Sequence, residues 1–347
     1  MTWDRLPSVS VLALGGTIAS TGAGAGVTPT LTAEQLVESV PGLADVARIE
    51  ADTFRQVPSP ELTLVDLVAL AREIEKRIDG GDIGVVVTQG TNTIEETAFA
   101  LDLLVASDAP VVVTGAMRNP TLPGADGPAN LLAAVSTAAS RQARGLGTLV
   151  VFADEIHAAR YVRKAHTQRI MPFRSSPIGP IGWISENAAR IGARPAGRRH
   201  LRLADISEAP PVALLTFGSG DEGLLAKAVA PAGYRALVVE ATGGGHVTER
   251  SVEELERLAG LMPVVLASRT GSRELLSRTY SFVGSEVDLA ERGLINGRAM
   301  TAARARMLLR LLLAADATIE DARQAFDALG APGTTADLLG GRLTVTA

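Results

Sequence analysis

Hydroxyl and amide side chains crowd two short turns that each follow an apolar run. The first turn is Gly15–Ser20, where two glycines precede Thr17. Adjacent glycines let a ligand approach the backbone closely, and their N–H groups can bind an anion or oxyanion. In the second turn, Thr88–Thr93, every residue except Gly90 is polar. Both turns are therefore candidate places for chemistry, with Thr17 and Thr91 presenting hydroxyls there.

Each turn also has a structural interpretation. Gly15–Ser20 suits a tight strand-to-loop turn whose threonine bonds locally, and it contains neither a G-x-G-x-x-G fingerprint nor a P-loop lysine. In the second turn, a helix N-cap with Glu95 and Glu96 beside the helix dipole explains one polar side chain. It does not explain the whole run from Thr88 to Thr93.

A basic stretch, Arg160–Lys164, follows another apolar run. A lysine that is desolvated near strand ends has a lowered pKa and can act as a base. The structural alternative is an exposed basic loop, and spacing alone favours that loop. Lys164 is therefore a candidate base only if the fold brings it to the two turns.

The elements that must position these residues are apolar runs ending in glycine or a hydroxyl residue. Such runs, without alternation, are typical of strands buried on both faces. They lie at Val9–Thr17, Ile83–Thr91, Pro110–Met117, Thr148–Glu155, Pro211–Gly220, Ala236–Gly245 and Pro263–Ser272. Segments with helical periodicity alternate with them, at Thr32–Val40, Thr63–Arg77, Thr93–Ala106, Asn130–Arg144, Asp221–Ala230, Ser251–Leu261 and Ala302–Ala315. This order predicts an α/β fold with a mainly parallel sheet, whose ligands bind beyond the carboxyl ends of the strands.

The 347 residues suggest two domains. A segment rich in Gly, Pro and Arg, 192–211, is predicted to be a linker between a larger N-terminal α/β domain, 1–191, and a smaller C-terminal α/β domain, 212–347. The last residues, 331–347, are expected to be irregular or a β-hairpin.

Composition limits the function. The net charge is −5 and basic residues are not clustered, so no nucleic-acid partner is expected. The chain has no cysteine, and its four histidines are not spaced for a zinc helix, so neither a metal nor another cofactor is expected. No apolar run has membrane-spanning length and no signal sequence is apparent, which predicts a cytoplasmic protein without a membrane partner.

Several motifs together carry a resemblance. GGTIAS at 15–20, TQGTNTIEETA at 88–98, GAMR with ADGPANL within 115–131, and Lys164 after an arginine-containing loop follow one another in this order. The pattern resembles the bacterial L-asparaginase/glutaminase family, and the similarity continues through 280–288 and the helix ARARMLLRLLL at 303–313.

The resemblance implies an amidohydrolase in which Thr17 attacks a side-chain amide carbon and forms an acyl-enzyme. Thr91 and Lys164 would belong to a second catalytic group, with Asn92 at its acidic position. Ser59 matches a serine that holds the substrate α-carboxylate. Further substrate contacts are expected from Gly16, Gln89, Gly90 and Ala116.

The resemblance also implies that active sites are shared between subunits. Glu286 matches an acid that contacts the substrate amino group from a neighbouring subunit, and His246 occupies a position usually held by a polar side chain. Members of the family are usually tetramers built from dimers. A homodimer or homotetramer acting on a small amide is therefore expected.

Three departures leave the substrate open. In place of the family motif T-H-G-T-D-T, this chain has glutamine instead of histidine at 89 and asparagine instead of aspartate at 92. In addition, the glycine-rich loop 20–28, a predicted lid, lacks a tyrosine that family members often carry there. Because Asn92 is uncharged, ammonium recognition should suffer more than nucleophile activation. The candidates are hydrolysis of L-asparagine, hydrolysis of an amide without a free α-amino group (an N-substituted amide, lactam or carbamate), and weakly catalytic binding of amides.

Overall fold

The computed structural model describes residues 6–21, 28–204, 206–271, 274–330 and 345–346. Residues 22–27 of the predicted lid and most of the predicted tail, 331–344 and 347, lie outside the described residues. The chain divides into two compact units, Met1–Arg198 and Arg199–Ala347. We call them unit 1 and unit 2. The domain limits expected from composition stay a prediction.

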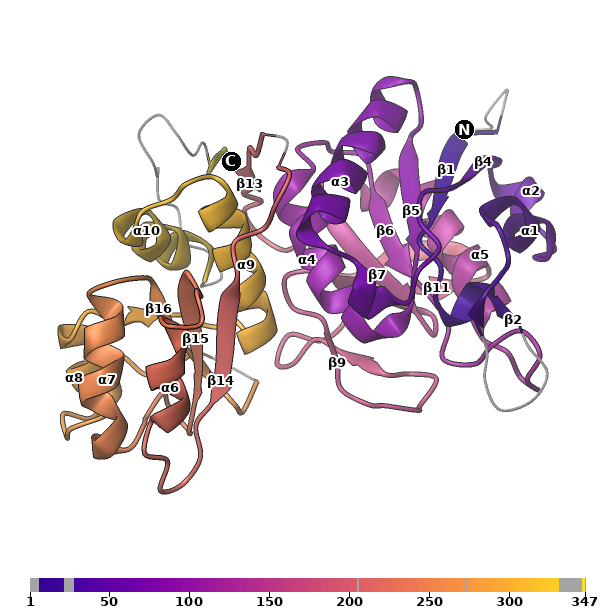
Figure 1. Ribbon diagram of the computed structural model, residues 1–347. Helices are drawn as coiled ribbons and strands as arrows, with labels where there is room; N and C mark the ends of the chain where they lie inside the picture. The colour runs from indigo at the N-terminus through magenta and orange to yellow at the C-terminus, as the bar shows by residue number, and fades with distance from the viewer. Residues whose placement is uncertain (1–5, 22–27, 205, 272–273, 331–344, 347) are drawn as a thin grey trace. The chain divides into compact units, whose positions relative to one another are not determined.

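An eight-stranded sheet forms the centre of unit 1 (Figure 1). From edge to edge its strands are β12 (Ala188–Ile191), β11 (Gly182–Ser185), β8 (Glu155–Ala158), β7 (Thr148–Phe152), β6 (Val111–Thr114), β5 (Gly84–Thr88), β1 (Ser8–Ala13) and β4 (Arg48–Thr53). The strands from β7 to β4 run parallel, and β8, β11 and β12 extend the sheet in antiparallel pairs.

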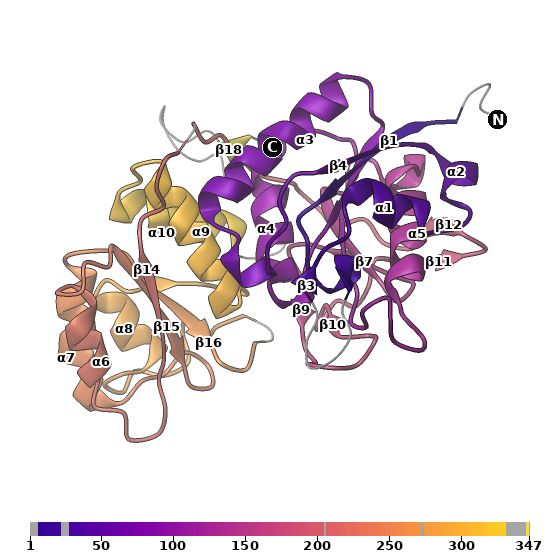
Figure 2. The same ribbon diagram turned by 45° about the vertical axis from the view of Figure 1, so that its right-hand side comes forward.

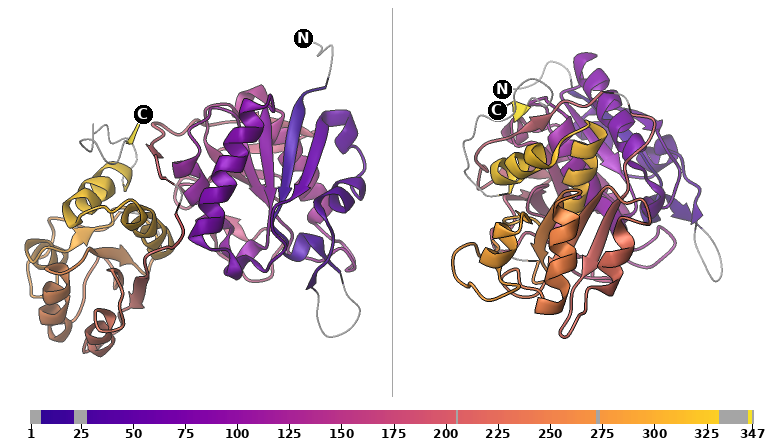
Figure 3. Two further views of the ribbon diagram at one scale, coloured as in Figure 1. Left: turned by 45° about the horizontal axis from the view of Figure 1, so that its top comes forward. Right: turned by 60° about the vertical axis from the view of Figure 1, so that its left-hand side comes forward.

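Helices cover both faces of this sheet (Figures 1 and 3). One layer contains α1 (Ala33–Glu38), α2 (Leu43–Val46) and α5 (Gly127–Ala138), and the other contains α3 (Leu64–Asp79) and α4 (Ile94–Leu104). Within β5, Val86 packs toward the first layer, whereas Val85 and Val87 pack toward the second. Burial on both faces explains the unbroken apolar runs, and the predicted α/β class is confirmed.

Local chemistry sets the helix starts. Thr32 accepts a hydrogen bond from the Gln35 N–H and caps α1, and Thr63 caps α3 in the same way with Asp66. α4 follows directly on a 3-10 turn, η3 (Thr91–Thr93). Further 3-10 turns in the described residues are η1 (Thr17–Ala19), η2 (Ser59–Glu61) and η4 (Arg141–Ala143). Short antiparallel pairs are formed by β2 (Ser20–Thr21) with β3 (Thr28–Pro29) and by β9 (Arg163–Lys164) with β10 (Phe173–Arg174).

Unit 2 contains a four-stranded parallel sheet in the order β14 (Val212–Thr216), β15 (Ala236–Ala241), β16 (Val264–Ser268) and β17 (Ile295–Asn296). Helices α6 (Leu224–Val229) and α7 (Glu249–Ala259) lie on one side of it and α9 (Ala302–Ala314) on the other (Figures 1 and 2). Helices α8 (Glu286–Glu291) and α10 (Ile319–Leu329) and the pair β13 (His200–Leu201) with β18 (Val345–Thr346) complete unit 2. The predicted smaller α/β domain is thus confirmed.

No helix in the described ranges is both long enough and apolar enough to cross a bilayer.

Candidate active site

Thr17 and Thr91 follow neighbouring parallel strands of unit 1. β1 pairs with β5, with Ala13 opposite Thr88, and the Leu14 N–H donates to the main-chain oxygen of Thr88 at 2.8 Å. The carboxyl ends of both strands therefore meet at one edge of the sheet, which is where α/β folds bind ligands.

Gly16 and Gly90 bring the two threonine turns into contact. The φ of Gly16 is 86°, in the left-handed region that favours glycine. A Cβ built on Gly16 would lie 2.1 Å from the nitrogen and 2.4 Å from the Cα of Gly90. No side chain fits in that space. Thr17 and Thr91, the residues that follow these glycines, are thus carried by two touching segments of backbone.

Ser59 lies against the same contact. It begins η2, and a Cβ built on Gly90 would lie 2.9 Å from the Ser59 hydroxyl oxygen. The preceding residues of this loop pack on the first turn, because a Cβ on Gly15 would lie 2.8 Å from the main-chain oxygen of Val57. The loop after β4 therefore joins the ends of β1 and β5.

The end of β6 is the fourth segment that packs at this edge of the sheet. A Cβ built on Gly115 would lie 2.4 Å from the main-chain oxygen of Gln89 and 3.3 Å from Cγ2 of Thr91. Ala116, which follows Gly115, is fully buried. All the candidate residues of these four segments thus lie on backbone that converges at one edge of the sheet.

Lys164 on β9 reaches this edge from a distant part of the chain. Its ammonium nitrogen lies 2.8 Å from Oγ1 of Thr91 and 3.0 Å from Oδ1 of Asn92. Burial lowers the pKa of Lys164 below its ordinary value, and the negative charge of Glu95 opposes that shift. Lys164 is half-buried rather than part of a freely exposed loop. The arrangement suits a base beside a threonine hydroxyl.

The amide of Asn92 has a defined orientation. A lysine ammonium only donates hydrogen bonds, so the atom that faces it must be the amide oxygen. The Asn92 NH₂ group is therefore directed away from Lys164, on a residue that is exposed. Where an aspartate would offer a second acceptor oxygen, this chain offers two N–H donors.

Three buried polar atoms near the convergence have no hydrogen-bond partner within the described part of the chain. They are the hydroxyl oxygens of Ser59 and Thr88 and Oε1 of Gln89. The other end of the Gln89 amide donates weakly to the main-chain oxygen of Gly90 at 3.3 Å and to Oγ1 of Thr93 at 3.5 Å. Buried polar atoms without partners are rare in folded proteins. Their concentration here is typical of a site that binds polar ligands.

Glu286 and His246 form a pair within unit 2. His246 Nε2 lies 2.9 Å from Oε2 of Glu286, and the N–H groups of Thr279 and Tyr280 donate to Oε1 at 2.7 and 2.8 Å. Burial would raise the pKa of Glu286, but the N–H groups of Tyr280 and Thr279, together with His246, hold it below its ordinary value. The Glu286 side chain is only 1% exposed and that of His246 21%, so the histidine is the member of the pair that meets solvent.

Sequence reasoning missed two residues that order the loop after β6. Asp126 accepts hydrogen bonds from the N–H groups of Met117 and Arg118. Asn130 is buried, donates to the main-chain oxygen of Gly115 at 3.0 Å and accepts from the Ala153 N–H at 2.9 Å. Both lie in the ADGPAN segment, so the signal was present, but their partners are visible only in the fold.

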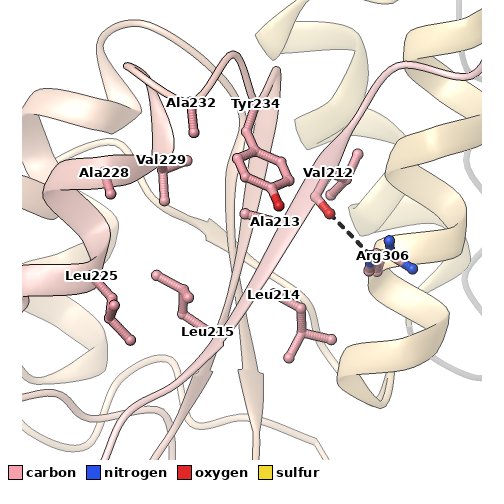
Figure 4. Close-up of a pocket in the computed structure, with 10 residues that line it drawn as sticks. All are labelled: Val212, Ala213, Leu214, Leu215, Leu225, Ala228, Val229, Ala232, Tyr234 and Arg306. Atoms are coloured by element: carbon pink, nitrogen blue, oxygen red, sulfur yellow. Dashed lines mark hydrogen bonds between the residues drawn. The ribbon is translucent and has the colours of Figure 1, made fainter.

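A hollow of about 510 Å³ beside the edge strand β14 offers no comparable chemistry (Figure 4). Its lining is apolar apart from Tyr234 and Arg306, and Arg306 donates from Nε to the main-chain oxygen of Val212 at 3.0 Å. Across the described ranges, no group of three or more His, Asp or Glu side chains is arranged to hold a metal ion.

Two known protein families match this chain. Residues 8–196 match the family described as "Asparaginase, N-terminal", and residues 211–326 match the "Glutaminase/Asparaginase C-terminal domain". These two matches cover the described elements from β1 to most of α10, except β13.

Individual relatives match over most of the chain. The "Probable L-asparaginase" of Deinococcus radiodurans is 38% identical over 92% of this chain and 97% of its own, and the "Glutaminase-asparaginase" of Pseudomonas fluorescens is 37% identical over 74% of each. The crystal structure of a "Probable Cytoplasmic L-asparaginase" from Campylobacter jejuni superposes with a TM-score of 0.83, at 30% identity, over 92% of this chain and 99% of that one. The chain therefore belongs to the bacterial L-asparaginase/glutaminase family.

Proposed function

We propose that this protein is an amidohydrolase that converts L-asparagine to L-aspartate and ammonia through an acyl-threonine intermediate. The observation that carries the proposal is the 2.8 Å hydrogen bond between Lys164 and Thr91, at an edge where the Thr17 turn touches the Thr91 turn. The names of the relatives support this substrate class.

In the proposed reaction, the Thr17 hydroxyl oxygen attacks the carbon of the substrate side-chain amide. The hydroxyl proton passes to the Thr91–Lys164 group, since a lysine with a lowered pKa can accept it. Backbone N–H groups of the glycine turns stabilise the negative oxygen of the tetrahedral intermediate. The C–N bond breaks, the proton is delivered to the leaving nitrogen, and ammonia departs. Water then attacks the Thr17 ester, the C–O bond to Thr17 breaks, and aspartate leaves as the hydroxyl recovers its proton.

The neighbouring residues are proposed to hold the substrate. The buried Ser59 hydroxyl, which lacks a partner among the described residues, would donate to the α-carboxylate. Gln89 would orient the substrate with its free amide oxygen, and the backbone at Gly16, Gly90 and Ala116 would provide further contacts to it. Thr17 is half-buried and can be reached by a small molecule.

Ammonia release from L-asparagine and L-glutamine tests the proposal. The native protein should release ammonia, and Thr17→Ala should reduce the rate to background while the far-ultraviolet circular dichroism is unchanged. Thr21 is unsuited as a control because it flanks the predicted lid, so Thr30→Ala is the matched control and should retain activity. Full activity of Thr17→Ala on every amide tested would remove Thr17 as the nucleophile.

A second substrate class, amides without a free α-amino group, is favoured by the orientation of Asn92. Its exposed NH₂ group donates hydrogen bonds, and a substrate ammonium also only donates. The Asn92 NH₂ group and a substrate ammonium would repel each other, whereas a neutral group or a hydrogen-bond acceptor on the substrate suits the position next to Asn92. Succinamate, which is asparagine without its amino group, is the matched substrate for the comparison.

One experiment distinguishes substrates with a free α-amino group from substrates without one. If Asn92 disfavours ammonium, the ratio of kcat/KM for L-asparagine to that for succinamate should rise in Asn92→Asp by about 5- to 150-fold, corresponding to about 1–3 kcal/mol for a charge-assisted hydrogen bond. An unchanged ratio would show that position 92 does not select for the amino group.

A weakly catalytic amide-binding protein, the third candidate, would bind these amides without turnover. The hydrogen bond between Thr91 and Lys164 argues against this candidate.

We also propose a cytoplasmic homodimer or homotetramer in which unit 2 of a neighbouring subunit supplies His246 and Glu286. The His246 side chain is partly exposed, which supports a contact between this histidine and the substrate. The buried Glu286 would orient His246 through their hydrogen bond. Activity should then fall on dilution in step with dissociation measured by light scattering. A fully active monomer would exclude a role for these residues in trans.

A further inference from the structure

Glu95, two residues after the end of the threonine motif at Thr93, is the carboxylate that is hydrogen-bonded to Lys164. Its Oε2 accepts a hydrogen bond from the Lys164 main-chain N–H at 3.2 Å, joining the start of α4 to β9. The sequence alone assigns Glu95 only the general role of complementing a helix dipole. The contact is specific, because it spans 69 positions in the chain and ends on the residue that bonds Thr91.

We propose that Glu95 is a positioning residue for Lys164, which fixes the Lys164 main chain and provides the negative charge that position 92 lacks. The inference rests on the proposed function, in which Lys164 is the base. It goes beyond that function by assigning the electrostatic partner of the base to a residue outside the threonine motif.

The charges around Lys164 support this assignment. On β9 and β10, Lys164 is opposite Phe173, whereas Arg163 is opposite Arg174. Side chains alternate along a strand, so both arginines belong to the face away from Lys164. On η3 the groups beside the ammonium are the neutral Thr91 and Asn92. Of the acids that open α4, Glu95 and Glu96, the charge of Glu95 is the one that acts on Lys164 and raises its pKa against the effect of burial.

Removing the negative charge destabilises the ammonium form, so Lys164 should lose its proton at a lower pH. Glu95→Gln removes the charge and keeps an acceptor oxygen for the Lys164 N–H, which separates electrostatics from positioning. Glu95→Asp keeps the charge and shortens the side chain, so it tests the positioning part and remains informative if Glu95→Gln folds poorly.

The sequence makes a direct measurement practical, because the chain contains only three lysines, Lys76, Lys164 and Lys227. Protein labelled with ¹³C at the lysine ε-carbon gives three resonances, and the one missing from Lys164→Arg identifies Lys164. Its titration midpoint should move to lower pH in Glu95→Gln. It should return toward the native value in the double variant Asn92→Asp/Glu95→Gln, which restores a carboxylate beside the ammonium.

Glu75→Gln is the matched control. Glu75 is also a half-buried helical glutamate that accepts a main-chain N–H from another segment, that of Ala106 at 3.1 Å. Its replacement should leave the Lys164 midpoint unchanged. An unchanged midpoint in Glu95→Gln, or an equal shift in Glu75→Gln, would overturn the proposal. Because the resonance titrates whether or not an amide is hydrolysed, this result is distinguishable from a failure of the proposed function, which ammonia release reports separately.

Discussion

The ammonium nitrogen of Lys164 lies 2.8 Å from the hydroxyl oxygen of Thr91, and its second side-chain partner, Asn92, is uncharged. A lysine held by two neutral acceptors and partly withdrawn from water loses its proton more easily than one paired with a carboxylate. The site therefore combines a threonine hydroxyl with a base that can be neutral at a lower pH than an ordinary lysine.

Removing this base should abolish most of the turnover. Lys164→Met keeps much of the side-chain volume but cannot accept a proton, and Thr91→Val keeps the shape but removes the hydroxyl. Each should lower kcat by about 10²- to 10⁴-fold, the usual contribution of general acid–base catalysis. Steady-state ammonia release measures the effect. Lys76→Met, at a lysine whose side chain is 76% exposed, is the control and should be fully active. Native turnover in Lys164→Met would mean that another group accepts the proton.

The activity should rise with pH through the titration of Lys164. Only the neutral amine can act as a base, so protonated enzyme is inactive below the pKa of Lys164, which burial has lowered. Asn92→Asp places a carboxylate beside the ammonium, raises the pKa of Lys164, and should move the acid limb of kcat to higher pH. A profile of kcat against pH for both proteins checks this. A limb that moves to lower pH in Asn92→Asp would contradict the electrostatic role of position 92.

The sequence predicted which strands carry the site more fully than it predicted the contacts between the residues of the site. Apolar runs at β1, β5, β6 and β7 are visible because both faces of these strands are buried. The edge strand β4, with the sequence RIEADT and partial or full exposure along its length, has no such run and was missed. The helix expected from Asn130 begins earlier, at Gly127, with proline in its first turn, and it ends at Ala138.

The same limit applies to single residues. Thr17 and Thr91 could be named because polar side chains at strand ends have no packing reason to be there, and Ser59 could be named because the chain resembles a family with a serine at that position. The link between Glu95 and the Lys164 main chain could not, since it depends on the path of a short hairpin far along the chain. Periodicity and propensity do not encode the position of such a hairpin.

Gly16 should be irreplaceable for reasons of space as well as conformation. In Gly16→Ala the new Cβ would lie 2.1 Å from the nitrogen of Gly90, so the two threonine turns must separate. Gly42 provides a matched control, because its φ of 83° is almost the same but nothing lies within 4 Å of an added Cβ. Gly42→Ala should cost about 1–2 kcal/mol of unfolding free energy from the left-handed conformation alone.

Gly16→Ala should cost at least about 1–3 kcal/mol more, the usual penalty of overpacking, and should also lose activity because Thr17 is displaced. Urea unfolding and ammonia release measure the two effects. Equal stabilities of the two variants would show that the backbone around Gly90 yields easily, and that close contact between the turns is not required.

The buried His157 gives unit 1 a further pH dependence that is independent of the active site. Its side chain is 1% exposed, Nδ1 lies 2.9 Å from the Ser175 hydroxyl, and burial together with the charge of Arg174 lowers the pKa of His157 to about 4. In the unfolded chain the pKa is about 6.5. Between these values the unfolded state binds a proton that the folded state does not, so stability falls as the pH falls.

The shift corresponds to about 3 kcal/mol of unfolding free energy, lost progressively between about pH 6.5 and pH 4. His157→Gln keeps a polar side chain next to Ser175 but cannot take up the proton. The difference in stability between native protein and His157→Gln should therefore change with pH in this window, in the direction that favours the variant as the pH falls. Urea unfolding followed by the fluorescence of Trp183, which lies in the same unit, measures it. A difference that is constant from pH 7 to pH 4 would mean that His157 takes up its proton as readily in the folded protein as in the unfolded chain, with Glu155, 3.3 Å from Nε2, as its partner.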